Sequence, residues 1–378
     1  MVTAVDEVLQ RLGLTPAIDA AFAAARAAGM RLARVAAQHR GGHVLLGSGA
    51  QLGGDADALV ELRADSSGRL RRAVAQDPAA GPAVGDWVAV TVAGERPTAT
   101  IHEVLPRHTK LSRRAAGRGA SEQMVAANVD TVFLVCPLDQ PLNLRRIERL
   151  LTIALESGAG AAVVLTKADL CDDPAAARAT LGARTDRDGA AIPVHVISSV
   201  SGVGLAELDM YTSTPRTAAL IGASGVGKST LINRWLGHER QAVNAVRDDG
   251  KGRHTTTHRE LLVLPQGGLV IDTPGMRELG LWRSDEGLQG AFADVTALAE
   301  RCRFRDCSHA GVPGCAVEAA VADGSLPPER AASFAKLQRE QEQLVRERDV
   351  LGRVRSRQAD KRTQRALRRH YKDEGQRE

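Results

Sequence analysis

Aromatic side chains are scarce in this sequence of 378 residues, at 3% of the total. Its cores must therefore consist mainly of Leu, Val, Ile and Ala side chains. Long apolar runs are also lacking, since the longest, such as Val132–Val135 and Ala161–Leu165, have only the length of strands. A membrane span needs about 20 apolar residues. The first residues include Asp6 and Glu7 and no basic leader, so we expect no signal peptide, no membrane association and a cytoplasmic location.

Cysteines are few and odd in number, which does not suit a framework of disulfide bonds. Three of the five lie between Cys302 and Cys315, while Cys136 and Cys171 lie apart. This distribution is typical of a cytosolic protein with one metal site.

The remaining composition is that of a soluble globular protein, with 43% apolar and 25% charged residues. The length predicts two or three domains. A net charge of +5 is a weak indication of a polyanionic partner.

The first part of the chain is expected to hold a helical extension and a small β-barrel. Residues 1–33 are rich in Ala with helical spacing, which predicts either a docking helix or a frayed extension. Residues 34–112 carry short alternating segments separated by Gly, Pro and Asp, which predicts a small all-β barrel. The five predicted strands are Ala33–Ala36, His43–Leu46, Ala58–Arg63, Trp87–Val92 and Ala99–Leu105.

A basic loop is predicted after the last barrel strand, with Lys110, Arg113, Arg114 and Arg118. A small barrel with basic loops suits an oligonucleotide. An ordinary solvated loop explains these residues equally well.

Residues 128–295 alternate strand and helix, which predicts an α/β domain over residues 113–295 with a mostly parallel sheet covered on both faces. One predicted helix has Leu144, Ile147, Leu150, Leu151 and Leu155 on a single face and ends at Gly158. The predicted strands are Thr131–Val135, Ala161–Leu165, Val194–Ile197, Ala219–Ile221, Glu260–Leu264 and Leu269–Ile271.

The strongest motif is a phosphate-binding loop between an apolar strand and a helical pattern. It fits Gly, four residues, Gly-Lys-Ser, and it consists of Gly222, Ala223, Ser224, Gly225, Val226, Gly227, Lys228, Ser229 and Thr230. Its glycines allow backbone N–H groups to point at a phosphate, and the helix N-terminus adds positive potential. Lys228 is expected to bind the β- and γ-phosphates, and the Ser229 hydroxyl to bind Mg²⁺.

A second motif, expected beside the Mg²⁺ ion, follows the strand Leu269–Ile271. An Asp at a strand end can hold the Mg²⁺ shell, and the Gly275 N–H can reach the γ-phosphate. The motif is Asp272-Thr273-Pro274-Gly275.

A carboxylate after another apolar strand predicts guanine as the base. Asp169 can accept from the N1–H and exocyclic amine of guanine together, and the Lys167 stem can lie along the purine ring. The segment Thr166, Lys167, Ala168 and Asp169 is similar to the Asn-Lys-x-Asp motif of GTPases. Thr166 cannot make the two-sided tether of an amide, so weaker base fixation is expected. Ser198 and Ser199 are candidates for the loop that contacts the guanine O6.

These motifs occur in a permuted order, because the base motif precedes the phosphate loop. A sheet of the same strands can form the same site when the two termini of the usual chain order are joined and the chain begins and ends at another connection. The segment after Asp272 then leads directly into the C-terminal region, and we expect nucleotide-dependent changes to pull on that region.

The loop Asp248–His258 is glycine-containing and resembles a switch segment. One of its threonines is expected to bind Mg²⁺ with bound GTP; Thr256 is favoured, then Thr257. Met276 stands where many GTPases place a Gln that orients the attacking water. His254 is therefore the candidate for that task, although a structural role is the alternative.

Residues 296–345 are predicted to form a mostly helical zinc domain. Cys302, Cys307, His309 and Cys315 supply three thiolates and one imidazole, which fits a closed tetrahedral structural Zn²⁺ site. Residues 346–378 form a basic tail, which is either an RNA-contacting helix or a solvated segment.

Together these motifs resemble the ribosome small-subunit-dependent GTPase A family, known as RsgA or YjeQ. The resemblance covers about residues 34–345. It depends on the motifs above and on three further segments, Gly85-Asp86-Trp87-Val88, Asn128-Val129-Asp130 and Asn143–Arg149. It implies a barrel of the oligonucleotide-binding (OB) type, a circularly permuted GTPase domain and a zinc domain, with GTP or GDP, Mg²⁺ and Zn²⁺ as ligands.

The family also implies late maturation of the small (30S) ribosomal subunit, with its rRNA as partner and GTP hydrolysis stimulated by that subunit. His254 falls on the proposed hydrolysis histidine, which with Lys228 and Asp272 makes the expected catalytic set. We expect a monomer that binds no DNA. The alternatives are an RNA-binding assembly scaffold with a vestigial GTPase and an ATP-dependent phosphotransferase, against which Asp169 argues.

Overall fold

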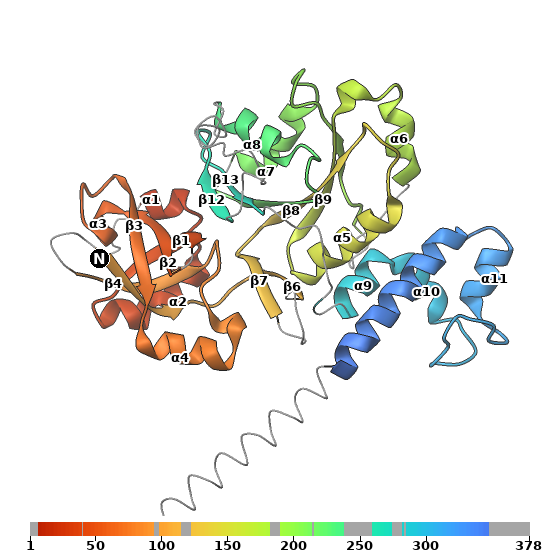
Figure 1. Cartoon of the computed structure of the whole chain (residues 1–378), viewed down its shortest axis with the longest axis horizontal. Helices are drawn as coiled ribbons and strands as arrows, with labels where there is room; N and C mark the ends of the chain where they lie inside the picture. Colours follow the sequence, from red (N-terminus) through yellow and green to blue (C-terminus); the bar gives the residue numbers. More distant parts are fainter. Residues whose placement is uncertain are drawn as a thin grey trace, which may run out of the picture.

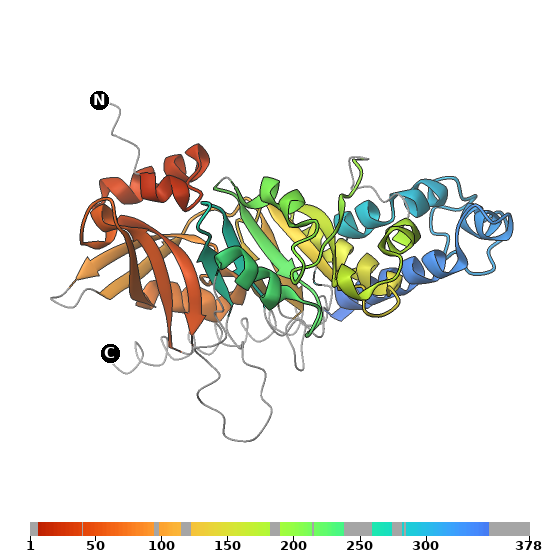
Figure 2. The same cartoon turned by 90° about the horizontal axis from the view of Figure 1, so that it is seen from above.

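The computed structural model describes residues 7–39, 41–93, 98–114, 122–181, 190–213, 215–237, 259–273, 282 and 285–347. The molecule is elongated, with a barrel at one end, an α/β sheet in the middle and helices at the other end (Figures 1 and 2). In the described ranges, no helix combines the length and the apolar character needed to cross a membrane.

Five strands close into a barrel, as the sequence predicts. β1 pairs with β2, β2 with β3, β3 with β5 and β5 with β4, and β4 returns to pair with β1. Only the β3–β5 pairing in this barrel is parallel. The strands are β1 (Arg31–His39), β2 (Gly42–Ser48), β3 (Leu59–Ser66), β4 (Trp87–Ala93) and β5 (Thr98–Val104).

A short helix, α4 (Gly68–Gln76), fills the connection between β3 and β4 and was not predicted. Ser67 caps it by accepting from the Leu70 N–H at 3.2 Å, and the Leu70 side chain is buried in the barrel core. α3 (Gly49–Leu52) and the 3-10 turn η1 (Pro78–Ala80) complete this part of the chain.

The N-terminal extension docks as helices in its described part. α1 (Glu7–Arg11) and α2 (Pro16–Ala27) bury Leu9 and Phe22 in the main core. The Thr15 side chain caps α2. Docking, rather than fraying, is therefore the outcome for residues 7–27.

The central sheet is mostly parallel, which confirms the prediction. Its strand order is β10-β9-β8-β11-β13-β12, and only β12 is antiparallel. β12 also meets the barrel through the pair Ala37↔Glu260. The strands are β8 (Thr131–Pro137), β9 (Gly160–Thr166), β10 (Val194–Val196), β11 (Thr217–Ile221), β12 (Glu260–Val263) and β13 (Leu269–Asp272).

Both faces of the sheet are covered. Along β8, Val132 and Leu134 enter one core cluster while Phe133 and Val135 enter another. α5 packs on the first face with the apolar side chains that the sequence predicts, and α8 covers the second. The helical elements are α5 (Leu144–Glu156), η2 (Ala168–Leu170), α6 (Pro174–Leu181), η3 (Leu205–Leu208), α7 (Asp209–Thr212) and α8 (Lys228–Leu236).

The prediction of a basic loop is wrong for the residues that the structure describes, because Lys110–Arg114 forms strand β6. It forms a hairpin with β7 (Glu122–Ala127). Lys110 pairs with Glu122 at 3.0 Å, and Arg113 Nε donates to Gln123 at 3.1 Å. Cross-strand pairing thus accounts for these basic side chains. Arg118 lies outside the described residues.

The C-terminal region is mostly helical, as predicted, with α9 (Asp285–Ala291), α10 (Ala293–Ala299), α11 (Ala316–Ala322) and a helix over residues 328–347. Gly287 lets α9 approach α5 closely, since a Cβ there would lie 2.4 Å from the Thr152 carbonyl oxygen. One core cluster runs from Val8 to Leu344. The domain boundaries named above therefore stay predictions.

A buried arginine joins the first three parts of the chain. The Arg34 side chain, 1% exposed, donates to carbonyl oxygens of Leu12 at 2.5 Å, Gly85 at 3.0 Å and Asn128 at 3.0 Å. Its guanidinium lies over the Trp87 ring. Burial lowers the pKa of Arg34 to about 10, so the group remains charged at neutral pH.

Replacing Arg34 with Met should destabilise the protein strongly, because the carbonyl groups of Leu12 and Asn128 would lose this donor and that of Gly85 would keep only the Asn128 amide. We expect a loss of about 3 kcal/mol or more, seen as a fall of roughly 5 °C or more in the apparent melting temperature. Arg31→Ala is the control, since Arg31 is exposed on the same strand. Equal melting temperatures for Arg34→Met and wild type would contradict the role of this side chain.

Candidate nucleotide-binding site and metal centre

The predicted nucleotide motifs lie at one edge of the sheet. β9, β8, β11 and β13 run parallel, so their carboxyl ends meet there. From β8 the chain proceeds to β9 on one side, while β11 is the neighbour on the other side. Ligands of open α/β sheets bind at such a switch point.

The phosphate loop joins β11 to α8 in the expected strand–loop–helix context. A Cβ on Gly222 would lie 2.5 Å from the Val135 carbonyl oxygen, so only glycine fits there. Gly227 has φ of 99°, a left-handed conformation that also favours glycine. Lys228, the first residue of α8, donates through Nζ to the carbonyl oxygens of Gly222 at 3.0 Å and Ala223 at 2.6 Å. The predicted residues from Gly222 to Thr230 thus form the connection after β11 and the first turn of α8.

Lys228 is 8% exposed, and burial lowers the pKa of its ammonium. Nearby Asp272 opposes this shift, and Arg146 adds to it. Asp272 ends β13 and pairs in register with Leu220 of the phosphate-loop strand. Lys228 at the start of α8 and Asp272 at the end of β13 thus lie near each other at this sheet edge, with opposite charges.

The predicted base motif follows β9 at the same edge. Lys167 takes a left-handed conformation with φ of 59°, and Ala168 and Asp169 begin a 3-10 turn. The Ser198 hydroxyl donates to Asp169 Oδ1 at 2.5 Å, and Ser199 follows in a turn. Ser198 therefore orients the carboxylate that we expect to bind guanine.

A single hydrogen bond closes the base motif onto the phosphate loop. The Thr166 hydroxyl donates to the Val226 carbonyl oxygen at 2.6 Å, and the Cys136 carbonyl oxygen lies at 3.4 Å. Because a hydroxyl has one hydrogen, the shorter contact is the bond. Thr166 thus makes one hydrogen bond to the phosphate loop, as expected for a hydroxyl in place of an amide.

Several predicted site residues lie outside the described part of the chain. They are His254, Thr256, Thr257, Gly275 and Met276. Their roles in hydrolysis and Mg²⁺ binding stay predictions.

Two side chains near the site have no role that the sequence alone assigns. Asp139 in the β8–α5 loop pairs with Lys167 at 2.6 Å. Arg146 lines a cavity of about 200 Å³ together with Cys136, Ala223 and Val226. Asp139 lies outside the motifs that the sequence shows, whereas Arg146 lies within the segment Asn143–Arg149, which by itself assigns it no role.

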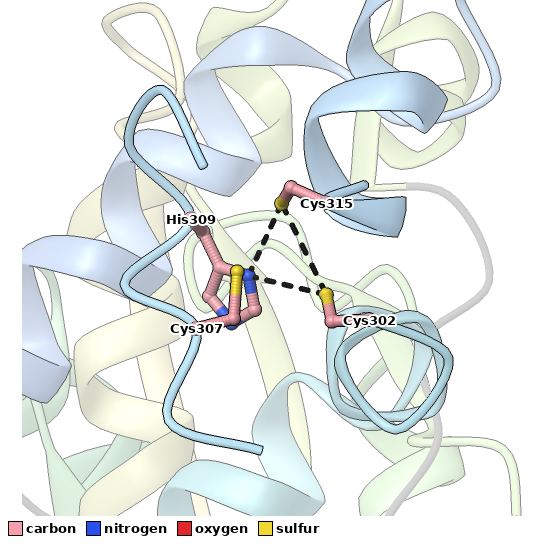
Figure 3. Close-up of side chains that lie close together, drawn as sticks. All are labelled: Cys302, Cys307, His309 and Cys315. Carbon is pink, nitrogen blue, oxygen red and sulfur yellow. Dashed lines mark hydrogen bonds between the residues drawn. The ribbon is translucent and has the colours of Figure 1, made fainter. Parts of the chain in front are cut away.

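The four predicted metal ligands converge, with their donor atoms all within 4.8 Å of one another. Cys302 Sγ lies 3.6 Å from His309 Nδ1 and 4.0 Å from Cys315 Sγ, and these last two atoms are 3.4 Å apart (Figure 3). Tetrahedral Zn²⁺ with bonds of about 2.0–2.3 Å requires donor separations of roughly 3.3–3.8 Å. Three thiols and one imidazole at these distances fit Zn²⁺.

The backbone around the cluster also suits a metal. Ala316 and Glu318 donate N–H groups to the sulfur atoms of Cys302 and Cys315, each at 3.4 Å. Such donors stabilise thiolate ligands. Burial lowers the pKa of His309, which favours the neutral imidazole that binds a metal.

The fold and the site together define a circularly permuted P-loop GTPase with an N-terminal barrel. Comparison with known proteins is more specific: the chain belongs to the RsgA GTPase family, whose model matches residues 104–282. The small ribosomal subunit biogenesis GTPase RsgA of Opitutus terrae is 49% identical over 333 residues, covering 85% of this chain and 87% of that protein.

Two solved structures have the same architecture. YjeQ from Thermotoga maritima aligns with a TM-score of 0.58 and 26% identity, over 82% of this chain and 98% of that chain. YloQ, described as a circularly permuted GTPase, aligns with a TM-score of 0.55 and 24% identity, over 83% of this chain and 96% of that chain. The second likeness supports the fold alone.

Loss of one ligand should remove the metal and loosen the C-terminal helices. Cys307→Ser is expected to abolish stoichiometric zinc in the purified protein and to increase hydrogen exchange across residues 293–322, because a closed site supplies much of the local folding energy. Cys171→Ser is the matched control, since Cys171 is outside the cluster. Full zinc content and unchanged exchange in Cys307→Ser would rule out this assignment.

Proposed function

We propose that this chain is a GTPase that binds the small ribosomal subunit and hydrolyses GTP to drive late subunit maturation and its own release. One observation carries the nucleotide part of the proposal. The Thr166–Val226 bond holds the base motif against the phosphate loop at one sheet edge. The ribosomal part is supported by relatives named small ribosomal subunit biogenesis GTPases.

The phosphate end of the site would bind the triphosphate. The backbone N–H groups of the loop and the N-terminus of α8 would surround it. Lys228 would move from its loop carbonyl partners to the β- and γ-phosphates, where its charge stabilises the transition state. Ser229 and Thr256 would hold Mg²⁺ directly and Asp272 its shell. When bound, Mg²⁺ neutralises charge that develops on the phosphates.

The base end would select guanine. Asp169 would accept from two guanine N–H groups, while Ser198 keeps the carboxylate in place through its 2.5 Å bond. The Lys167 stem would lie along the purine ring. Adenine offers an acceptor where guanine offers a donor, so this carboxylate disfavours ATP.

Hydrolysis requires a group that orients water, and His254 is our candidate because Met276 is unsuited to that task. The Gly275 N–H would contact the γ-phosphate. A partner that positions His254 against the attacking water would raise turnover, which agrees with stimulation by a ribosomal subunit.

The barrel and basic side chains suit rRNA as the polyanionic partner. The barrel is closed, as in the predicted OB type. We also propose that the protein is a monomer in the cytoplasm and that it does not bind DNA. An RNA-binding scaffold with a vestigial GTPase is less favoured, because buried Lys228 and Asp272 are retained together.

Turnover with purified subunits tests the proposal. GTP hydrolysis at a stated salt concentration should rise strongly on adding small subunits and change little with large subunits. His254→Ala should keep GTP affinity but lose about 100-fold or more in stimulated turnover, as expected for a lost water-orienting group. Stimulated turnover equal to wild type would remove the His254 assignment, and no response to small subunits would contradict the proposed partner.

A further inference from the structure

Lys167 is held by a carboxylate from outside the base motif. Its Nζ lies 2.6 Å from Oδ2 of Asp139, with the two side chains 30% and 33% exposed. Asp139 belongs to the connection between β8 and α5, whereas Lys167 follows β9. The ion pair therefore bridges two segments at the rim of the candidate base site.

Strand register brings the two residues together. Pro137 at the end of β8 pairs with Thr166 at the end of β9, and the Leu138 N–H donates to the Thr166 carbonyl oxygen at 2.8 Å. The chain direction after this bond places Asp139 beside Lys167. Backbone pairing that extends to Leu138 thus sets the point in the β8–α5 loop from which Asp139 reaches Lys167.

Lys167 benefits from such a partner. A lysine side chain has four flexible carbons, so holding its stem in one conformation costs entropy. The Lys167 ammonium donates to Asp139 Oδ2, while the neighbouring Thr166 hydroxyl donates to Val226. Asp139 therefore supplies the acceptor that fixes the end of the lysine side chain.

The two carboxylates near the base site have separate partners. Asp169 accepts from the Ser198 hydroxyl, while Asp139 pairs with the Lys167 ammonium. Asp169 is thus available for the guanine edge without competing for the lysine.

We propose that Asp139 is a positioning residue for guanine recognition, which holds Lys167 so that its aliphatic stem is in place at the base-binding rim before nucleotide binds. The inference rests on the proposed guanine-nucleotide site. It adds a function for a residue outside the base motif. Its effect falls on nucleotide retention and not on the phosphoryl-transfer step.

Release of fluorescent mant-GDP from the full chain measures this effect. Asp139→Asn keeps the shape of the side chain and removes its charge. For an exposed ion pair, we expect release about two- to five-fold faster at low salt. The difference should shrink in about 1 M salt, because the charges are then screened. Turnover at saturating GTP should stay unchanged.

A double-mutant cycle separates positioning from a general structural role. On a Lys167→Met background, Asp139→Asn should cause no further change in release, because its partner is gone. Asp19→Asn is the matched control: Asp19 pairs with Arg26 on α2, and both side chains are about half exposed. That control should release mant-GDP like wild type, and all variants should melt alike without nucleotide.

Two results would overturn the inference: wild-type release rates in Asp139→Asn at low salt, or an equal effect of Asp139→Asn with and without Lys167. Failure of the proposed function is distinguishable, because wild-type protein would then bind no mant-GDP at all. That result would remove the inference together with the site.

Discussion

The hydrogen bond from the Thr166 hydroxyl to the Val226 carbonyl oxygen is the contact on which the site depends. It joins the ends of β9 and the phosphate loop across the sheet edge. Parallel pairing of β9, β8, β11 and β13 brings these ends near one another whatever their order in the chain. A permuted sequence can therefore form the same pocket as an unpermuted one, provided that the strand neighbours are retained.

The same edge is mechanically connected to the C-terminal helices through α5. Arg146, near the start of this helix, lines the cavity beside the phosphate loop. Farther along, Glu148 pairs with Arg330 at 2.9 Å and Arg149 pairs with Glu340 at 2.6 Å. The first pair is largely buried, so its loss would leave a buried charge unpaired. The helix over residues 328–347 is thus tied to the nucleotide domain by charge as well as by apolar packing, and Arg330 also pairs with Asp294 of α10, the helix that precedes the metal ligands.

Much of this architecture could be predicted from local sequence signals. Alternating apolar residues located all five barrel strands, and continuous apolar runs located the sheet. The phosphate loop and the metal cluster were recognisable because their residues are close together in the chain. Long-range pairing is not predictable from local signals: the sequence alone indicates a basic loop at β6 and shows neither the buried hydrogen bonds of Arg34 nor the pairing of Asp139. In each case the deciding partner is remote in sequence, such as Glu122 for Lys110.

A crystal structure of the full chain with bound GDP tests the central claim most directly. The account predicts that the guanine N1–H and exocyclic amine both donate to the Asp169 carboxylate while the β-phosphate lies within the loop at Lys228. It also predicts that the Thr166–Val226 bond is retained. A base bound away from Asp169, with phosphates elsewhere than the loop, would contradict the account.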